Sequence, residues 1–409
     1  MARVLVCWEL GAGLGHIGPL LAGAETLRGR GHTVLFAIRD THDPGDLLAQ
    51  RGFDYLQAPV PVPTQAASTP AIHTWPQVLL SVGFHTPRAL AARLRAWRRL
   101  FELVAPDVLV CEHAPSALLA ARGLGVRRLV TGATGFIVPP SLPSYPDLRL
   151  PPADPGLLAR DEQRLLDVMN AALGSLGEPP FACAGELFAE AAAYIATLPE
   201  LDPYAGCAPR EYVGPANIRG LPSPEWPDGE GPRLFVYVQR FPTLPALLDI
   251  LRQTRCRALV QVAGLERPPP EFENTPHLRF LAGPVDLPAA AQTADLGISH
   301  GGGTTAATFL CAGKPQLLLP YHFEQLLTSE AVARLGAGLV APQRHPEGMR
   351  AKLARLLADP AFTEAARTVA ARHAGLDPER PVRRLVEAVE QASTTPRVAV
   401  TSTNAIGGG

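Results

Sequence analysis

Short apolar runs recur along the whole chain, and stretches with the character of helices separate them. Such runs suit the buried strands of parallel sheets, which helices cover on both faces. The first half is expected to form strands at 4–8, 33–38, 107–111 and 128–131, with helices at 20–29 and 115–123. The second half is expected to form strands at 234–238, 258–262, 278–281, 296–299 and 316–319. This alternation predicts an α/β chain with two doubly wound, Rossmann-like domains that face each other across a cleft.

Proline-rich segments suggest where the domains divide. The longest, at 198–232, is expected to be an interdomain linker with one short strand inside it. Near the end of the chain, Val382, Leu385, Val386 and Val389 fall on one side of a predicted amphipathic helix. The residues after it are mostly small and polar. We therefore expect a first domain over 1–215, a second over 216–376, a helix over 377–391 and a disordered tail over 392–409.

Composition and charge narrow the class of protein. With 409 residues, 47% of them hydrophobic, the chain is long enough for two cores. Its formal net charge of −1 provides no global field that would attract nucleic acid, so small-molecule chemistry fits better. The six cysteines lack metal-binding spacing and indicate reduced thiols. No secretory signal and no apolar run of about 18 residues are present, which predicts a cytoplasmic protein without a transmembrane segment.

A glycine-rich turn in the second half is the strongest candidate for ligand binding. His300, Gly301, Gly302, Gly303, Thr304 and Thr305 follow a predicted strand and open a predicted helix. Backbone N–H groups at a helix start, together with the helix dipole, favour a phosphate or a pyrophosphate. The hydroxyls and the imidazole could donate to the same oxygens. The alternative is a tight strand-to-helix turn that binds nothing.

A polar pair lies about twenty residues further on. Glu324 and Gln325 follow the predicted strand at 316–319, at the edge of the sheet where open α/β folds bind ligands. An adjacent acid and amide can accept from and donate to sugar hydroxyls. The alternative is a solvated loop tip.

The turn after the first strand contains a candidate base. It does not complete a dinucleotide-binding GxGxxG pattern, because His16 occupies the place of the last glycine. An imidazole at this turn would project into the cleft, and its ordinary pKa suits proton abstraction near neutral pH. Glu112, at the end of the strand at 107–111, is the candidate partner for His16. The alternatives are that His113 is the partner, or that Glu112 is purely structural.

These segments resemble the family-one glycosyltransferases, which include macrolide and antibiotic glycosyltransferases and UDP-glycosyltransferases. The resemblance is carried by GLGHIGPLLAGAETL from Gly13 to Leu27, by His300 with the Gly/Thr turn, and by Pro-x-x-x-Glu-Gln from Pro320. It implies a glycosyltransferase-B fold, with acceptor bound by the first domain, donor bound by the second, and a C-terminal helix packed back on the first. It further implies that His16 is the general base, that Glu112 stands where family members often have aspartate, that His300 to Thr305 hold the diphosphate, and that Glu324 and Gln325 hold the donor sugar.

The hypothesis is a metal-independent, inverting transfer from a UDP- or dTDP-sugar to a hydroxyl. The chain has no Asp-x-Asp sequence, so a helix dipole rather than a metal ion is expected to neutralise the diphosphate, and no cofactor is expected. Arg240 is a candidate phosphate ligand or, equally, a surface loop residue. The competing functions are a sugar-nucleotide epimerase of the same fold and a non-catalytic sugar-nucleotide-binding partner protein.

The acceptor is expected to meet an apolar surface. Segments 60–90 and 136–156 carry Trp75, Phe84, Phe136 and Tyr145 among prolines, which favours an apolar or aromatic small molecule. The arginines between residues 88 and 99 form a solvated helix face or, alternatively, a peripheral contact with an anionic surface. The sequence leaves the donor base, the sugar, the acceptor and the oligomeric state open.

Overall fold

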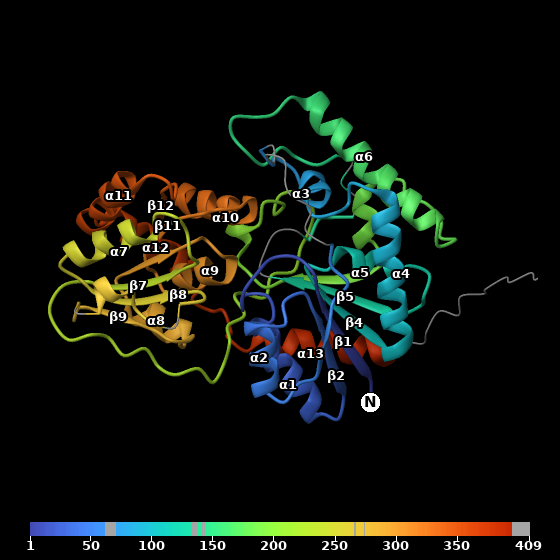
Figure 1. Cartoon of the computed structure of the whole chain (residues 1–409), viewed down its shortest axis with the longest axis horizontal. Helices are drawn as coiled ribbons and strands as arrows, with labels where there is room; N and C mark the ends of the chain where they lie inside the picture. Colours follow the sequence, from blue (N-terminus) through green and yellow to red (C-terminus); the bar gives the residue numbers. More distant parts are fainter. Residues whose placement is uncertain are drawn as a thin grey trace, which may run out of the picture.

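Two parallel six-stranded sheets form the centres of two lobes, one blue to green and the other yellow to orange (Figure 1). The computed structural model describes residues 1–61, 71–132, 137–140, 142, 144–265, 267–273 and 275–394. Helices lie against both sheets, so the predicted class of two Rossmann-like α/β domains is confirmed.

The first sheet has the strand order β3-β2-β1-β4-β5-β6. Its strands are β1 Arg3–Trp8, β2 Thr33–Ile38, β3 Tyr55–Gln57, β4 Val108–Glu112, β5 Arg127–Gly132 and β6 Ala191–Ile195. Its helices are α1 Gly18–Gly29, α2 Asp43–Gln50, α3 Trp75–Ser81, α4 Pro87–Val104, α5 Pro115–Ala120 and α6 Pro155–Gly174, with the short 3₁₀ helices η1 Ala184–Phe188 and η2 Pro199–Leu201. In register, Trp8 at the end of β1 lies beside Glu112 at the end of β4.

The second sheet has the order β12-β11-β10-β7-β8-β9. Its strands are β7 Arg233–Val238, β8 Arg257–Val262, β9 Leu278–Phe280, β10 Leu296–Ser299, β11 Gln316–Leu318 and β12 Gly338–Val340. Its helices are α7 Leu244–Gln253, α8 Leu287–Thr293, α9 Gly303–Cys311, α10 Phe323–Arg334, α11 Pro346–Ala358 and α12 Ala361–Arg372, with the 3₁₀ helix η3 Pro270–Phe272.

Each predicted strand is present with its ends within one residue, but β3, β6 and β12 were not predicted. All three lie at an edge of a sheet. β3 and β12 have only three residues, and β6 begins with three alanines, two of which are exposed. A neighbouring strand offers hydrogen bonds to such an edge strand. The edge strand can therefore form without a long apolar run in its own sequence, and the apolar pattern does not reveal it.

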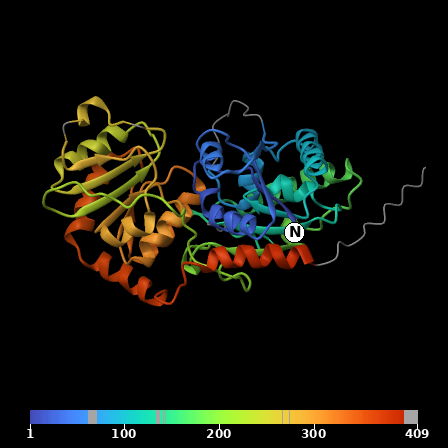
Figure 2. The ribbon, with the colours of Figure 1, turned by 90° about the horizontal axis from the view of Figure 1, so that it is seen from below.

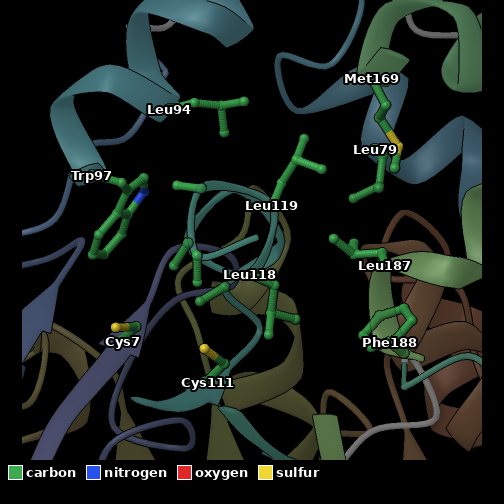
Figure 3. Close-up of a cluster of buried hydrophobic side chains, with 14 of the residues drawn as sticks. Cys7, Leu79, Leu94, Trp97, Cys111, Leu118, Leu119, Met169, Leu187 and Phe188 are labelled. Carbon is green, nitrogen blue, oxygen red and sulfur yellow. The ribbon is translucent and has the colours of Figure 1, made fainter. Parts of the chain in front are cut away.

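A buried cluster between the first sheet and helices α4, α5 and α6 supports the strand ends that carry candidate site residues (Figure 3). Cys7 on β1 and Cys111 on β4 lie opposite each other in register, and both are fully buried. Trp97 on α4 packs over this layer and donates from its indole N–H to Ser116 Oγ at 3.2 Å. Burial of both faces explains why these strands read as continuous apolar runs.

The chain crosses between the domains twice. The first crossing is the proline-rich segment, where the predicted strand is wrong: Tyr212 forms only an isolated bridge with Ile195. Pro209 and Pro215 flank this bridge, and proline has no N–H with which to extend a ladder. The second crossing leads from α12 into α13, Arg380–Thr394.

Helix α13 returns to the first domain and packs against α1, below the first sheet in Figure 2. Its buried side includes Leu385, which packs closely on Gly23 of α1. A Cβ atom on Gly23 would overlap the Leu385 side chain. The helix continues through Thr394, so the expectation of disorder from residue 392 is wrong for 392–394. Partly buried Ala392 still packs on the core there. Residues 395–409 lie outside the described part of the chain.

Candidate active site

The turn between β1 and α1 places His16 at the carboxyl edge of the first sheet. Its ring stacks on Trp8, with centroids 5.3 Å apart and planes at 21°. Gly11 allows this position, because it has φ +94° and a Cβ there would overlap the imidazole Nε2 and Cε1. The sequence therefore needs glycine at this place on two counts, backbone conformation and space.

Glu112 is the partner of His16. Its Oε2 lies 2.8 Å from Nδ1 of the imidazole, and the carboxyl is only 3% exposed. Burial raises the pKa of Glu112 to about 8 and lowers the pKa of His16 below its ordinary value. When the carboxyl is ionised it can accept from Nδ1–H, and this leaves Nε2 free to take a proton.

A buried acid that the sequence reading missed, Glu9, fixes the start of this turn. Its carboxylate accepts from the Ser116 and Ala117 backbone N–H groups at the start of α5, at 3.2 and 2.6 Å, and from the Ser116 hydroxyl. Burial raises the pKa of Glu9 to about 7. The carbonyl of His113, which has a left-handed φ of 44°, accepts from the Glu9 and Leu10 N–H groups. The ends of β1, β4 and α5 are thus tied together.

The glycine turn of the second domain opens helix α9. Gly301 has φ +82° and donates to Ser299 Oγ at 3.1 Å, and Gly302 is the N-cap residue. The Nδ1 of His300 and the Oγ1 of Thr304 are buried and have no hydrogen-bond partner within the described ranges. Such atoms are costly unless a ligand satisfies them, so the turn has the character of an anion site.

Glu324 and Gln325 occupy the first turn of helix α10 instead of a loop tip. The polar pair is therefore fixed by a helix, with Gln325 only 4% exposed and its Oε1 accepting from the Tyr321 N–H at 3.3 Å. Burial raises the pKa of Glu324 to about 7, and the nearby imidazole of His16 opposes that rise. The solvated-tip alternative is wrong, because the start of α10 faces the other domain.

A polar cavity of about 70 Å³ brings the two halves together. The predicted residues that line it come from both domains, and they are listed here: His16, Glu112, His300, Gly302, Gly303, Thr304, Thr305, Glu324 and Gln325. Gly301 lies behind this surface, against Ser329. Tyr237, Gln239, Tyr321 and His322 also line it and were not predicted, although His322 lies inside the Pro-x-x-x-Glu-Gln motif.

An apolar cavity of about 250 Å³ adjoins the polar one in the first domain. Trp75 lines it as predicted, together with Leu79, Leu118 and Phe188. Glu324 and His322 line both cavities, so the two share a boundary. The Glu112–His16 pair lies on the polar side of that boundary, and Gly11, against the imidazole, lies on the apolar side.

Two predicted aromatic residues do not reach the apolar cavity. Phe84 is fully buried below the guanidinium of Arg93, 4.9 Å from its ring centroid. Tyr145 stacks behind Trp75, at 5.5 Å, and supports it without lining the cavity. Phe136 lies outside the described residues. Aromatic residues among prolines were thus a poor guide to which rings face the ligand.

Arg240 does not line the polar cavity. It is exposed, and its guanidinium donates to the carbonyl of Gly264. Of the two roles left open for it, this placement is that of a surface loop residue. Within the ranges that the structure describes, no group of three or more His, Cys, Asp or Glu side chains is arranged to hold a metal ion. In the same ranges, no helix combines the length and the apolar character needed to cross a membrane.

Comparison with known proteins identifies the class. Residues 262–387 match the family described as "Erythromycin biosynthesis protein CIII-like, C-terminal domain". The PGL/p-HBAD biosynthesis glycosyltransferase of Mycobacterium tuberculosis (strain ATCC 25177 / H37Ra) is 27% identical over 355 residues, covering 78% of this chain and 79% of that protein. TDP-daunosamine transferase DnrS of Streptomyces peucetius is 33% identical over 119 residues, covering 28% of this chain and 26% of that protein.

Solved structures agree on the fold. Spinosyn rhamnosyltransferase SpnG complexed with thymidine diphosphate has a TM-score of 0.66 at 20% identity, covering 95% of this chain and all of that one. SpnG complexed with spinosyn aglycone gives 0.63 at 20% identity, with the same coverage. The chain therefore has the glycosyltransferase-B fold. More particularly, it is a homologue of glycosyltransferases, and its own second half carries an EryCIII-like C-terminal domain. The resemblance seen in the sequence is thus confirmed.

Proposed function

We propose that this protein transfers a sugar from a UDP- or dTDP-sugar to a hydroxyl of an apolar small molecule, with inversion at the anomeric carbon. The observation that carries the proposal is the position of the His16–Glu112 pair at the boundary of an apolar and a polar cavity. A hydroxyl compound in the first cavity and a sugar diphosphate in the second would meet at the imidazole.

In the proposed reaction, Nε2 of His16 removes the acceptor proton while the acceptor oxygen attacks the anomeric carbon. The bond from that carbon to the diphosphate oxygen breaks on the opposite face, which inverts the configuration. Glu112 stabilises the imidazolium that forms. The diphosphate leaves with the bonding electron pair, and His300 and the N–H groups at the start of α9 neutralise its charge. Glu324 and Gln325 bind hydroxyls of the sugar.

The relatives favour a thymidine nucleotide as the donor. SpnG has been solved with thymidine diphosphate, and the name of DnrS contains a TDP-sugar. A further cavity of about 90 Å³ adjoins the diphosphate turn and is lined by Ile218, Phe235, Val285 and Leu287. Its apolar walls suit the methyl group of thymine.

Donor binding and transfer by the purified chain test this function. We expect dTDP-glucose or UDP-glucose to raise the melting temperature, since a ligand that binds only the folded state stabilises it. Mass spectrometry with 2-naphthol as acceptor should then detect a glycoside, and NMR should show the anomeric configuration opposite to that of the donor. Binding without any transfer would favour the non-catalytic partner, and an epimerised donor would favour the epimerase.

Gly301→Ala is expected to weaken dTDP binding by at least about tenfold. A Cβ at this residue would overlap Ser329 Oγ and lie 2.9 Å from the Gln325 carbonyl oxygen, and φ +82° is unfavourable for alanine. Such a conformation costs about 1–3 kcal/mol, which the turn would relieve by moving its N–H groups. Isothermal titration with dTDP measures the loss.

The matched control for that substitution is Gly177→Ala. This glycine has a similar φ of +75°, but nothing lies within 4 Å of its Cβ position, and it follows α6, outside the polar cavity. If Gly301→Ala binds dTDP as tightly as Gly177→Ala does, the glycine turn does not hold the diphosphate.

A further inference from the structure

The apolar cavity carries polar side chains that the proposed transfer does not use. Among the described residues that line it, Ser81, His113, His322 and Glu324 are polar, and of these only Glu324 has a role in the proposed transfer. His113 directly follows β4 and has a left-handed φ. His322 is the N-cap residue of α10 in the other domain. Two imidazoles from different domains therefore line the end of the cavity next to the candidate base.

These imidazoles lie near each other and near His16. The ring centroids of His16 and His113 are 5.2 Å apart, with planes tilted by 52°. His322 is exposed to solvent, yet the surrounding protein lowers its pKa to about 4, first by desolvation and then by repulsion from His16 and His113. Burial likewise lowers the pKa of His113 to about 4. Both rings are thus neutral near pH 7, and each neutral ring has one N–H donor and one acceptor nitrogen.

His322 has hydrogen-bonding capacity to spare. It packs edge-on against Tyr321, with centroids 4.3 Å apart, but its ring makes no hydrogen bond within the described part of the chain. Because it lines both cavities, His322 lies at their shared boundary, where acceptor and donor would meet in the proposed reaction. His16 already has Glu112 as its partner, so His322 is not needed to orient the base.

We infer that the preferred acceptor carries two oxygens on adjacent carbons, one attacking the sugar beside His16 and the other hydrogen-bonded by His322, with His113 flanking it. This inference rests on the proposed function and names its acceptor class: a compact apolar ring system with a vicinal pair of oxygens at one edge. Oxygens on adjacent carbons are close enough for two neighbouring imidazoles to contact one each, while the rest of the ring lies against Trp75 and Leu118.

Three probes of equal ring size test the inference by isothermal titration of the full chain. 2-Naphthol has one hydroxyl, 2,3-dihydroxynaphthalene has two adjacent ones, and 2,6-dihydroxynaphthalene has two that are far apart. We expect the 2,3 isomer to bind about fivefold more tightly than 2-naphthol, the effect of one net hydrogen bond. The 2,6 isomer should gain nothing over 2-naphthol, since its second oxygen points into the apolar part of the cavity.

Variants assign the effect to residues. His322→Leu should abolish the preference for the 2,3 isomer, so that this isomer and 2-naphthol bind equally well. His322→Gln should restore part of the preference. His113→Asn should diminish it, and asparagine tolerates the left-handed backbone at this residue. His345→Leu, at an exposed residue before α11, is the control and should keep the full preference. The ratio between probes is an internal reference, so a general loss of affinity does not imitate the result.

Equal binding of the three probes by the wild-type chain, or no binding of any of them, would overturn the inference. A preference that survives in both His322→Leu and His113→Asn would overturn it too. Binding is measured without a nucleotide sugar, so the two proposals fail separately: a vicinal preference without any transfer contradicts the proposed function only, and transfer without the preference contradicts the acceptor class only.

Discussion

His16→Ala is expected to lower turnover by at least about 100-fold, with dTDP still bound within about twofold of wild-type affinity. General-base removal of a proton contributes roughly 10²–10⁴ to rate, and alanine leaves no other group at the Nε2 position. The glycine turn at the start of α9, which is proposed to hold the diphosphate, belongs to the other domain and should be unaffected. Initial rates at saturating donor and acceptor, together with titration of dTDP, measure both quantities.

The matched control for this substitution is His345→Ala, since that exposed histidine lies before α11 and outside both cavities. Turnover of His16→Ala close to that of the control would show that another group accepts the proton. His113 is a candidate substitute, with its ring centroid 5.2 Å from that of His16. In that outcome His113→Asn in the His16→Ala background should remove the remaining activity.

Glu112→Gln is expected to lower kcat/KM by at least about 100-fold and to remove its dependence on pH between about 6 and 9. In the wild-type protein, burial raises the pKa of the carboxyl to about 8. The negative charge of the ionised carboxyl is what stabilises the imidazolium, so the rate should rise as the pH increases through that value. Burial lowers the pKa of His16 below its ordinary value, which favours the neutral imidazole.

Glutamine keeps the size and one acceptor oxygen but cannot ionise, so the rising limb should disappear along with most of the rate. Glu112→Asp is the comparison variant, because it retains the charge while shortening the reach to His16. It should preserve the rising limb at a reduced rate. A pH profile in Glu112→Gln that still rises like that of the wild type would assign the ionisation to another group, and Glu324 is the next candidate, with its pKa raised to about 7.

The parts of the site that the sequence predicted are those that follow from sheet geometry. His16 follows β1 and Glu112 ends β4, and neighbouring parallel strands place their carboxyl ends at one edge, so the pair could be expected to meet. The glycine turn was predictable for the same reason, because it joins a buried strand to a helix. These residues can thus be predicted from the positions of the strand ends, without knowledge of side-chain packing.

The parts that could not be predicted depend on packing across layers. Phe84 and Trp75 lie in similar sequence surroundings, yet only Trp75 faces the cavity, because Phe84 is covered by Arg93. Glu9 appears in the sequence as one acid after a strand, and its role depends on the start of α5, about 107 residues away. His322 lies inside the Pro-x-x-x-Glu-Gln motif at one of its variable positions, and only its place at the shared boundary of the two cavities distinguishes it.

The double crossing between the domains has a mechanical consequence. The two connecting segments run alongside each other, with Gly214 of the first against Leu376 of the second, and Arg219 pairs with Glu379 at 2.8 Å. Two adjacent attachment points define a hinge axis, whereas a single linker would act as a swivel. Rotation about this axis would widen or narrow the space between His16 and the α9 turn, while sliding and twisting would strain both segments. Substrate entry and catalytic alignment would then be two positions of a single rotation.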